Sequence, residues 1–137
     1  MRENIHATCV SINNKGVLIL GDSGSGKSDL ALRLITLFSA KLVSDDRTDI
    51  FNDSGIIKAS APEILRGLLE VRGIGIIKQD YQKETKVDLV IKLISEKPER
   101  MPLPQKYQIG GTDIPLYLIN PFETSAPSKV FAALSLL

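Results

Sequence analysis

The segment "GVLILGDSGSGKSDLALRLITLF", residues 16–38, decides how the rest of the chain is interpreted. It opens with an apolar run at 17–20, which predicts a strand buried on both faces in the middle of a sheet. From residue 27 onward, apolar residues recur at helical spacing and predict a helix over 27–38. The segment is therefore expected to form a strand, a tight loop and a helix. The expected buried face of that helix consists of Leu30, Ala31, Leu34 and either Leu37 or Phe38.

The loop between strand and helix has the spacing Gly21-x-x-x-x-Gly26-Lys27-Ser28, the Walker A pattern of a phosphate-binding loop. Glycines let consecutive backbone N–H groups turn toward phosphate oxygens, and the helix start adds donors and a positive dipole end. Lys27 can reach the terminal phosphates of ATP, and the Ser28 hydroxyl can bind Mg²⁺. A glycine-rich turn without a ligand is the alternative. The expected phosphate contacts are Gly21, Asp22, Ser23, Gly24, Ser25, Gly26, Lys27 and Ser28.

The remaining pattern contains more hairpin signals than strand–helix units. Turn-forming residues separate apolar runs at 13–16, 52–55 and 110–113. A doubly wound fold would alternate strands and helices, so the fold class expected is α/β with a mixed, largely antiparallel sheet. Further strands are expected at 7–12, 41–44, 48–51, 56–60, 87–94, 107–109 and 114–119, and further helices at 62–69 and 127–137.

The composition indicates one globular domain over residues 1–137. Seventeen basic and sixteen acidic residues leave a net charge of +1, so no global field favours nucleic acid as a partner. The single cysteine, Cys9, excludes an internal disulfide and is expected to be a buried strand residue of a cytoplasmic protein. No apolar run approaches the ~20 residues that span a bilayer, and the first ten residues do not resemble a signal peptide. We expect a protein without a membrane partner.

Acidic side chains follow the strand expected at 41–44. A carboxylate of Asp45 or Asp46 at a strand end beside the loop can bind Mg²⁺ or take a proton from an attacking hydroxyl. The sequence does not assign these two roles, and the alternatives are an Asp-rich turn or a partner for Arg47. Glu70 and Arg72 lie two residues apart and share a face if extended, which suits a metal ligand and a phosphate clamp, or an edge salt bridge. His6 is the only histidine.

Three stretches, in this order, resemble the catalytic domain of HPr kinase/phosphorylase, the serine kinase of the phosphotransferase-system carrier HPr. They are "GVLILGDSGSGKSDLAL", "LVSDDR" and "APEILRGLLEVRGIGII", and weaker similarity covers essentially the whole chain. The resemblance implies a mixed-sheet P-loop fold like that of phosphoenolpyruvate carboxykinases. It also implies a cytoplasmic, ATP- and Mg²⁺-dependent enzyme that phosphorylates HPr or an HPr-like carrier, and a homohexamer.

The resemblance also implies residue roles. Lys27 and its loop would hold the triphosphate, with Ser28 and Glu70 as Mg²⁺ ligands. Asp45 falls where the family has its acid/base residue, which leaves Asp46 for the metal. The remaining catalytic residues that the resemblance implies are His6, Arg72 with the segment 72–78, and Arg100.

The chain departs from the family's pattern in three ways. His6 lies almost at the start, so the N-terminal domain of longer members is expected to be absent, as in the short form of alphaproteobacteria. Ala7 stands where the family usually has glycine. The stretch "LINPFETSAPSKV" at 118–130 lacks the arginine that the family uses for phosphorolysis. We therefore expect phosphorylation to be kept and residual phosphorylase activity at most.

Two other functions fit a phosphate loop. A small-molecule P-loop kinase would commonly have a parallel sheet and an arginine-rich lid, which the hairpin signals and sparse arginines disfavour. A non-catalytic sensor would bind ATP only to reshape a regulatory partner. Consumption of ATP that depends on a protein substrate distinguishes the HPr kinase interpretation from both.

Overall fold

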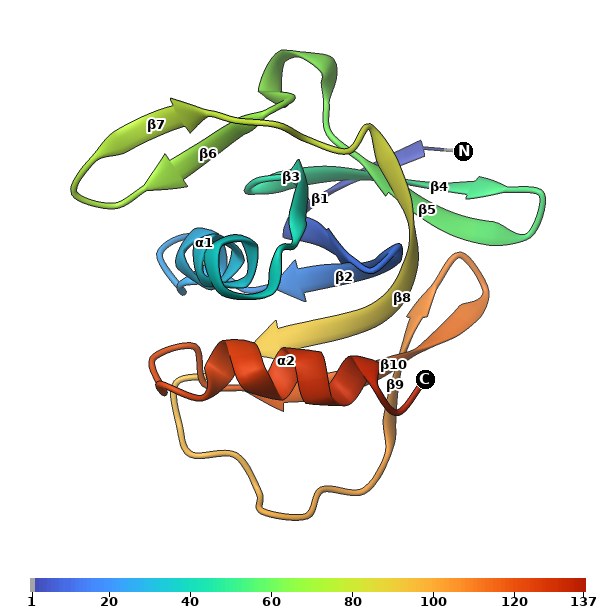
Figure 1. Cartoon of the computed structure of the whole chain (residues 1–137). Coiled ribbons are helices and arrows are strands. Elements are labelled where there is room, and N and C mark those ends of the chain that lie inside the picture. The colour runs from blue at the N-terminus through green and yellow to red at the C-terminus, as the bar shows by residue number, and fades with distance from the viewer. Residues whose placement is uncertain (1) are drawn as a thin grey trace.

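The computed structural model describes residues 2–137, which form one mixed sheet, a small separate hairpin and two α-helices. Figure 1 shows both helices on one side of the strands, with the β6–β7 hairpin projecting above α1. The strands are β1 (Arg2–Ile12), β2 (Lys15–Leu20), β3 (Lys41–Ser44), β4 (Arg47–Asp53), β5 (Ile56–Ser60), β6 (Leu68–Val71), β7 (Gly75–Lys78), β8 (Glu84–Leu93), β9 (Gln105–Ile109) and β10 (Thr112–Ile119). The helices are α1 (Lys27–Phe38), the short 3-10 helix η1 (Glu63–Leu65) and α2 (Ala126–Leu134).

Two long strands, β1 and β8, organise the sheet because each changes partner along its length. Residues 2–6 of β1 pair with β4 and residues 7–12 pair with β2. In the same way, residues 84–86 of β8 pair with β5, and later residues pair with β2 and β10. The strands β2, β1, β4, β5 and β8 therefore close into a ring. The pairs of β8 with β2 and with β10 are parallel, and the other strand pairs are antiparallel, which confirms the expected mixed sheet.

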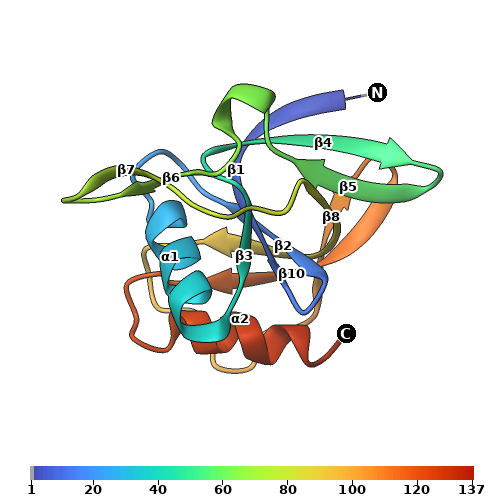
Figure 2. The same ribbon diagram turned by 45° about the horizontal axis from the view of Figure 1, so that its top comes forward.

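Apolar side chains of β2 are buried on both faces, as the unbroken run at 17–20 predicts. Leu18 belongs to a cluster built from strands alone, which also holds the buried Cys9. Val17 and Ile19 point the other way, into a second cluster that α1 and α2 complete. The helices contact each other through Phe38 and Phe131, whose ring centroids lie 5.1 Å apart. Figure 2 shows the two helices side by side. The sheet is thus covered on the face where α1 leaves the phosphate loop.

The expected helix over 27–38 is confirmed residue for residue. Its buried face is formed by Leu30, Ala31 and Leu34, while Leu37 is exposed and Phe38 takes the alternative place against the core. The C-terminal helix begins one residue earlier and ends three residues earlier than expected. Among the described residues, no helix is long and apolar enough to cross a membrane.

The prediction of a helix over 62–69 is wrong. Only residues 63–65 form a single 3-10 turn, and Gly67 then adopts a φ of 73°, which a right-handed helix does not allow. Residues 68–78 instead form the antiparallel hairpin β6–β7, so the glycine-interrupted stretch at 71–77 is not one extended strand. Gly73, with a φ of 87°, lies in the hairpin's turn. This hairpin brings Glu70 and Arg72 toward the N-terminus of α1.

Candidate active site

The phosphate loop connects the end of β2 to the start of α1. Gly24 and Gly26 adopt φ angles of 80° and 104°, in the left-handed region that glycine enters without steric cost. A Cβ on Gly26 would also approach Pro121 Cγ to 3.1 Å. The two glycines thus let the loop wrap closely around the helix start, where free backbone N–H groups gather.

Lys27 lies beneath the loop and is almost completely buried, with 4% of its side chain exposed. Its ammonium group donates to the carbonyl oxygens of Gly21 and Asp22, at 2.8 and 3.0 Å, and lies 3.8 Å from Asp46 Oδ1. Burial lowers the pKa of Lys27, and the charges of Asp46, Asp45 and Asp22 oppose that shift. A cation held in this way attracts an anion strongly, because little water screens it.

Asp45 points inward and both of its carboxylate oxygens are hydrogen-bonded. Oδ1 accepts from the hydroxyls of Ser28 and Thr8, at 2.6 and 2.9 Å. Oδ2 accepts from the backbone N–H of Glu70, at 3.0 Å. The residue is buried. Asp45 therefore joins the phosphate loop, β1 and β6, and it faces the loop serine rather than the open cavity.

Asp46 points outward because the chain turns sharply between the two acids. Its φ is 67°, a left-handed conformation that aspartate tolerates better than most residues, and its N–H donates to Thr8 Oγ1 at 3.0 Å. The side chain is 54% exposed, and Oδ1 lies 2.7 Å from His6 Nε2. Adjacent aspartates thus face different environments, and the buried Thr8 hydroxyl bonds to both of them.

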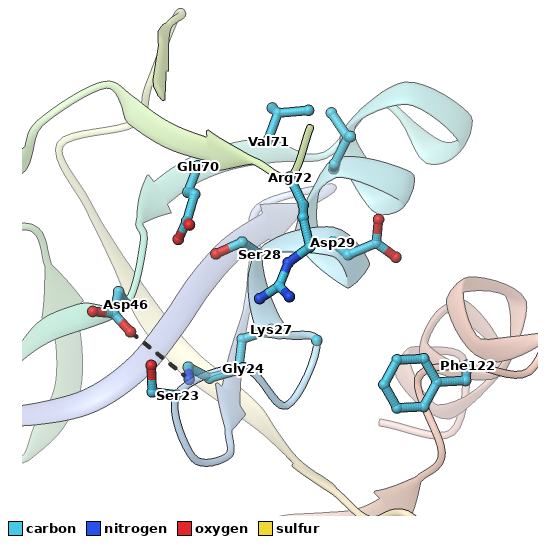
Figure 3. Close-up of a pocket in the computed structure, with 12 residues that line it drawn as sticks. Ser23, Gly24, Lys27, Ser28, Asp29, Asp46, Glu70, Val71, Arg72 and Phe122 are labelled. Atoms are coloured by element: carbon cyan, nitrogen blue, oxygen red, sulfur yellow. Dashed lines mark ion pairs between the residues drawn. The ribbon is translucent and has the colours of Figure 1, made fainter. Parts of the chain in front are cut away.

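The β6 strand supplies the opposite wall of the site. Glu70 lies on β6 and Arg72 lies in the turn that follows it, and both line a cavity of about 470 Å³ with Lys27, Ser28 and Asp46. Figure 3 shows the Glu70 carboxylate and the Arg72 guanidinium directed from the β6–β7 hairpin toward the phosphate loop. Acidic and basic groups from distant parts of the sequence therefore converge on the loop.

The structure brings most of the predicted residues together, but not Arg100. His6 joins the site through Asp46. Arg100 instead lies on the proline-rich loop after β8, where it lines a different cavity beside α2.

Thr8 and Phe122 also belong to the site, and the sequence analysis missed both. Thr8 could have been found, because it lies two residues after His6 and shares its face of β1. Nothing in the sequence marks Phe122, which a loop after β10 brings to the rim of the cavity.

The residues present fit a magnesium nucleotide. Mg²⁺ is usually held by one or two carboxylates together with substrate phosphates, rather than by a cage of protein ligands. Residues 2–137 contain no cluster of three or more His, Cys, Asp or Glu side chains that could hold a metal ion by themselves. The Ser28 hydroxyl and the Glu70 carboxylate offer hard oxygen ligands beside the loop. The Ser25 hydroxyl is buried in that loop without a hydrogen-bond partner among residues 2–137.

Comparisons with known proteins agree with this geometry. Residues 1–130 match the family described as the HPr Serine kinase C-terminal domain. The chain is 39% identical over 107 residues to HPr kinase/phosphorylase of Lactiplantibacillus plantarum, and 41% identical over 106 residues to that of Lactobacillus acidophilus. Each match covers 72% of this chain but only 34% and 33% of the relative, so the chain spans about a third of those proteins.

A solved structure extends the similarity to the whole fold. The HPr(Ser) kinase/phosphatase of Coxiella burnetii superimposes with a TM-score of 0.82 at 30% sequence identity. The match covers 98% of this chain and 89% of that one. The mixed sheet with its phosphate loop is therefore the fold of an HPr kinase domain.

Proposed function

The chain belongs to the HPr serine kinase C-terminal domain family, and we propose that it transfers the γ-phosphoryl group of ATP to a serine of HPr or an HPr-like carrier. The observation that carries this proposal is the convergence of Lys27, Asp46 and Arg72 on one cavity beside the phosphate loop. Phosphoryl transfer needs cations around the phosphate and a base beside the attacking hydroxyl, and this cavity offers both.

The acid/base role suits Asp46 better than Asp45, contrary to what the family resemblance implies. A base needs a free carboxylate lone pair within reach of the substrate hydroxyl. Asp45 is buried and accepts three hydrogen bonds, whereas the Asp46 side chain is 54% exposed and lines the cavity. We therefore propose that Asp46, not Asp45, takes the proton, and that Asp45 orients the Ser28 hydroxyl instead of Asp46 binding the metal.

The proposed step is an in-line displacement. The serine O–H proton passes to Asp46, the serine oxygen bonds to the γ-phosphorus, and the bond from that phosphorus to the bridging oxygen of ADP breaks. Lys27 and the loop N–H groups stabilise the charge on the phosphate oxygens, and Arg72 contacts them from the turn after β6. His6 holds the Asp46 carboxylate through its 2.7 Å contact, and because Asp46 is half exposed, it can release the proton to solvent.

Magnesium would be held by Ser28 and Glu70 together with phosphate oxygens. When bound, Mg²⁺ supplies positive charge that neutralises and aligns the triphosphate. Asp45 serves this site through its 2.6 Å hydrogen bond to Ser28, which directs the lone pairs of the serine oxygen.

Reversal by inorganic phosphate is expected to be weak. Residues 118–130 contain no arginine, and the neighbouring Arg33 of α1 donates to the carbonyl oxygens of Pro121 and Glu123 instead of facing the phosphate loop. We further propose, from the family resemblance, a cytoplasmic homo-oligomer, with six subunits as the expected number, and no nucleic-acid partner.

The experiment that tests this function is transfer of label from γ-labelled ATP to purified HPr. A carrier with its target serine changed to alanine is the matched control. We expect labelling of the first carrier only, and little loss of label when inorganic phosphate is added. ATP binding without transfer to any serine would instead favour the non-catalytic sensor.

A further inference from the structure

Three apolar side chains in the lining of the cavity at the phosphate loop have no part in the transfer mechanism: Leu32, Val71 and Phe122. Figure 3 shows Phe122 apart from Val71, on the side of the cavity next to the phosphate loop. In Figure 3, Phe122 lies on the other side of Lys27 from Asp46. A triphosphate with its terminal phosphate near Asp46 would leave the loop on the side of Phe122.

Phe122 is 75% exposed although it is a large apolar side chain. A flat ligand that covered this ring would remove apolar surface from water, which favours binding. Its position is also close to the loop, because a Cβ built on Gly26 would lie 3.9 Å from Phe122 Cζ. The ring thus stands directly beside the expected phosphates.

The backbone that carries Phe122 is anchored on both sides. The Phe122 N–H donates to Asn120 Oδ1 at 2.9 Å, and the Asn120 amide donates to the carbonyl oxygens of residues 95 and 96, at 3.2 and 3.3 Å. From α1, the Arg33 guanidinium donates to the carbonyl oxygens of Pro121 and Glu123. A platform fixed in this way loses little conformational entropy when a flat ligand stacks on it.

We propose that the Phe122 ring forms a nucleobase subsite, on which the base of the nucleoside triphosphate stacks. This rests on the proposed function, because it requires that the phosphates occupy the loop 21–28. Aromatic stacking recognises the face of the base rather than its hydrogen-bonding edge, so the ligand class is a nucleoside triphosphate with a large flat base.

Calorimetric titration with two probes tests the subsite. The probes are ATP and inorganic tripolyphosphate, both with Mg²⁺, and they share phosphates but differ in the base. We expect the Phe122→Ala variant to bind ATP about tenfold more weakly, while its affinity for tripolyphosphate stays within about twofold. Leu37→Ala is the matched control, because Leu37 is an apolar residue of α1 that is 65% exposed and does not line the cavity.

A Phe122→Trp variant gives a direct signal of stacking. The chain has no tryptophan, so this change introduces a single indole fluorophore. ATP is expected to quench its fluorescence, tripolyphosphate is not, and the affinity for ATP is expected to be kept.

Two results would overturn the subsite: equal affinity of the unaltered chain for ATP and tripolyphosphate, or unchanged ATP affinity in Phe122→Ala. These results differ from a failure of the proposed function. If ATP binds with the expected dependence on Phe122 but no serine is phosphorylated, the kinase proposal fails and the subsite remains. If the unaltered chain binds neither probe, both proposals fail.

Discussion

The cavity at the phosphate loop and the cavity between α2 and the loop after β8 have similar volumes, about 470 and 530 Å³, but different chemistry. In the first cavity, lysine, arginine and carboxylate groups lie close together, and they come from the start of α1, the end of β3 and the β6–β7 hairpin. The second is lined largely by apolar surface, including Tyr117, Leu118 and Leu136, with charged residues at its rim. Size alone therefore does not mark a site; polar groups held by the backbone of several elements do.

Among the variants that test the difference between the two cavities, replacement of Lys27 is expected to reduce phosphoryl transfer most. The Lys27→Ala variant removes the buried cation of the first cavity, so we expect transfer to fall on the order of a thousandfold and ATP binding to weaken. Label transfer to HPr and calorimetry measure the two effects. Lys41→Ala, which changes an exposed lysine at the start of β3, is the control and should leave both unchanged.

A Thr8→Val change is expected to have an intermediate effect. It removes the hydroxyl that bonds to both aspartates, and it leaves the Asp46 N–H without its acceptor. We expect the free energy of unfolding to fall by about 1–3 kcal/mol and transfer to fall about tenfold. Denaturant unfolding and label transfer are the measurements.

Thr48→Val separates positioning from stability. Thr48 is also buried, but its hydroxyl donates to the backbone carbonyl of Ala7, at 2.8 Å, and contacts neither acid. This control should lose comparable stability and keep the transfer rate per folded molecule. Equal loss of transfer in both threonine variants would mean that Thr8 has no specific role.

The smallest effect is expected at Arg100. Arg100 lines the second cavity and not the first. The transfer rate of Arg100→Ala should therefore stay within about twofold of that of the unaltered chain. Arg72→Ala, in the first cavity, is the matched comparison and should reduce transfer by more than tenfold. A large loss at Arg100 would show that the proline-rich loop reaches a reacting phosphate, and the contrast between the cavities would fail.

Local pattern was enough to predict the parts of the fold that depend on neighbours in sequence. The helix Lys27–Phe38 has a strong apolar period, and the turns at Asn13 and Gly55 are typical hairpin signals. The helix expected after Pro62 does not form because Gly67 takes a φ of 73° and residues 68–71 pair with 75–78 in a hairpin.

Side-chain direction in the site was harder to predict. Asp45 and Asp46 are adjacent, and only the turn with a φ of 67° at Asp46 and the distant Thr8 hydroxyl decide which acid points inward. Phe122 reaches the cavity through the packing of the loop after β10 on Arg33, which no local pattern encodes.

The most direct test of the central claim compares Asp46→Asn with Asp45→Asn in transfer from labelled ATP, at several Mg²⁺ concentrations. If Asp46 takes the proton, Asp46→Asn should lose about 10²–10⁴-fold in transfer while it still binds ATP. Asp45→Asn should require more Mg²⁺ and recover part of its activity when Mg²⁺ is raised, because its carboxylate orients Ser28. Transfer at the normal rate by Asp46→Asn, with loss of transfer at all Mg²⁺ concentrations in Asp45→Asn, would contradict the account.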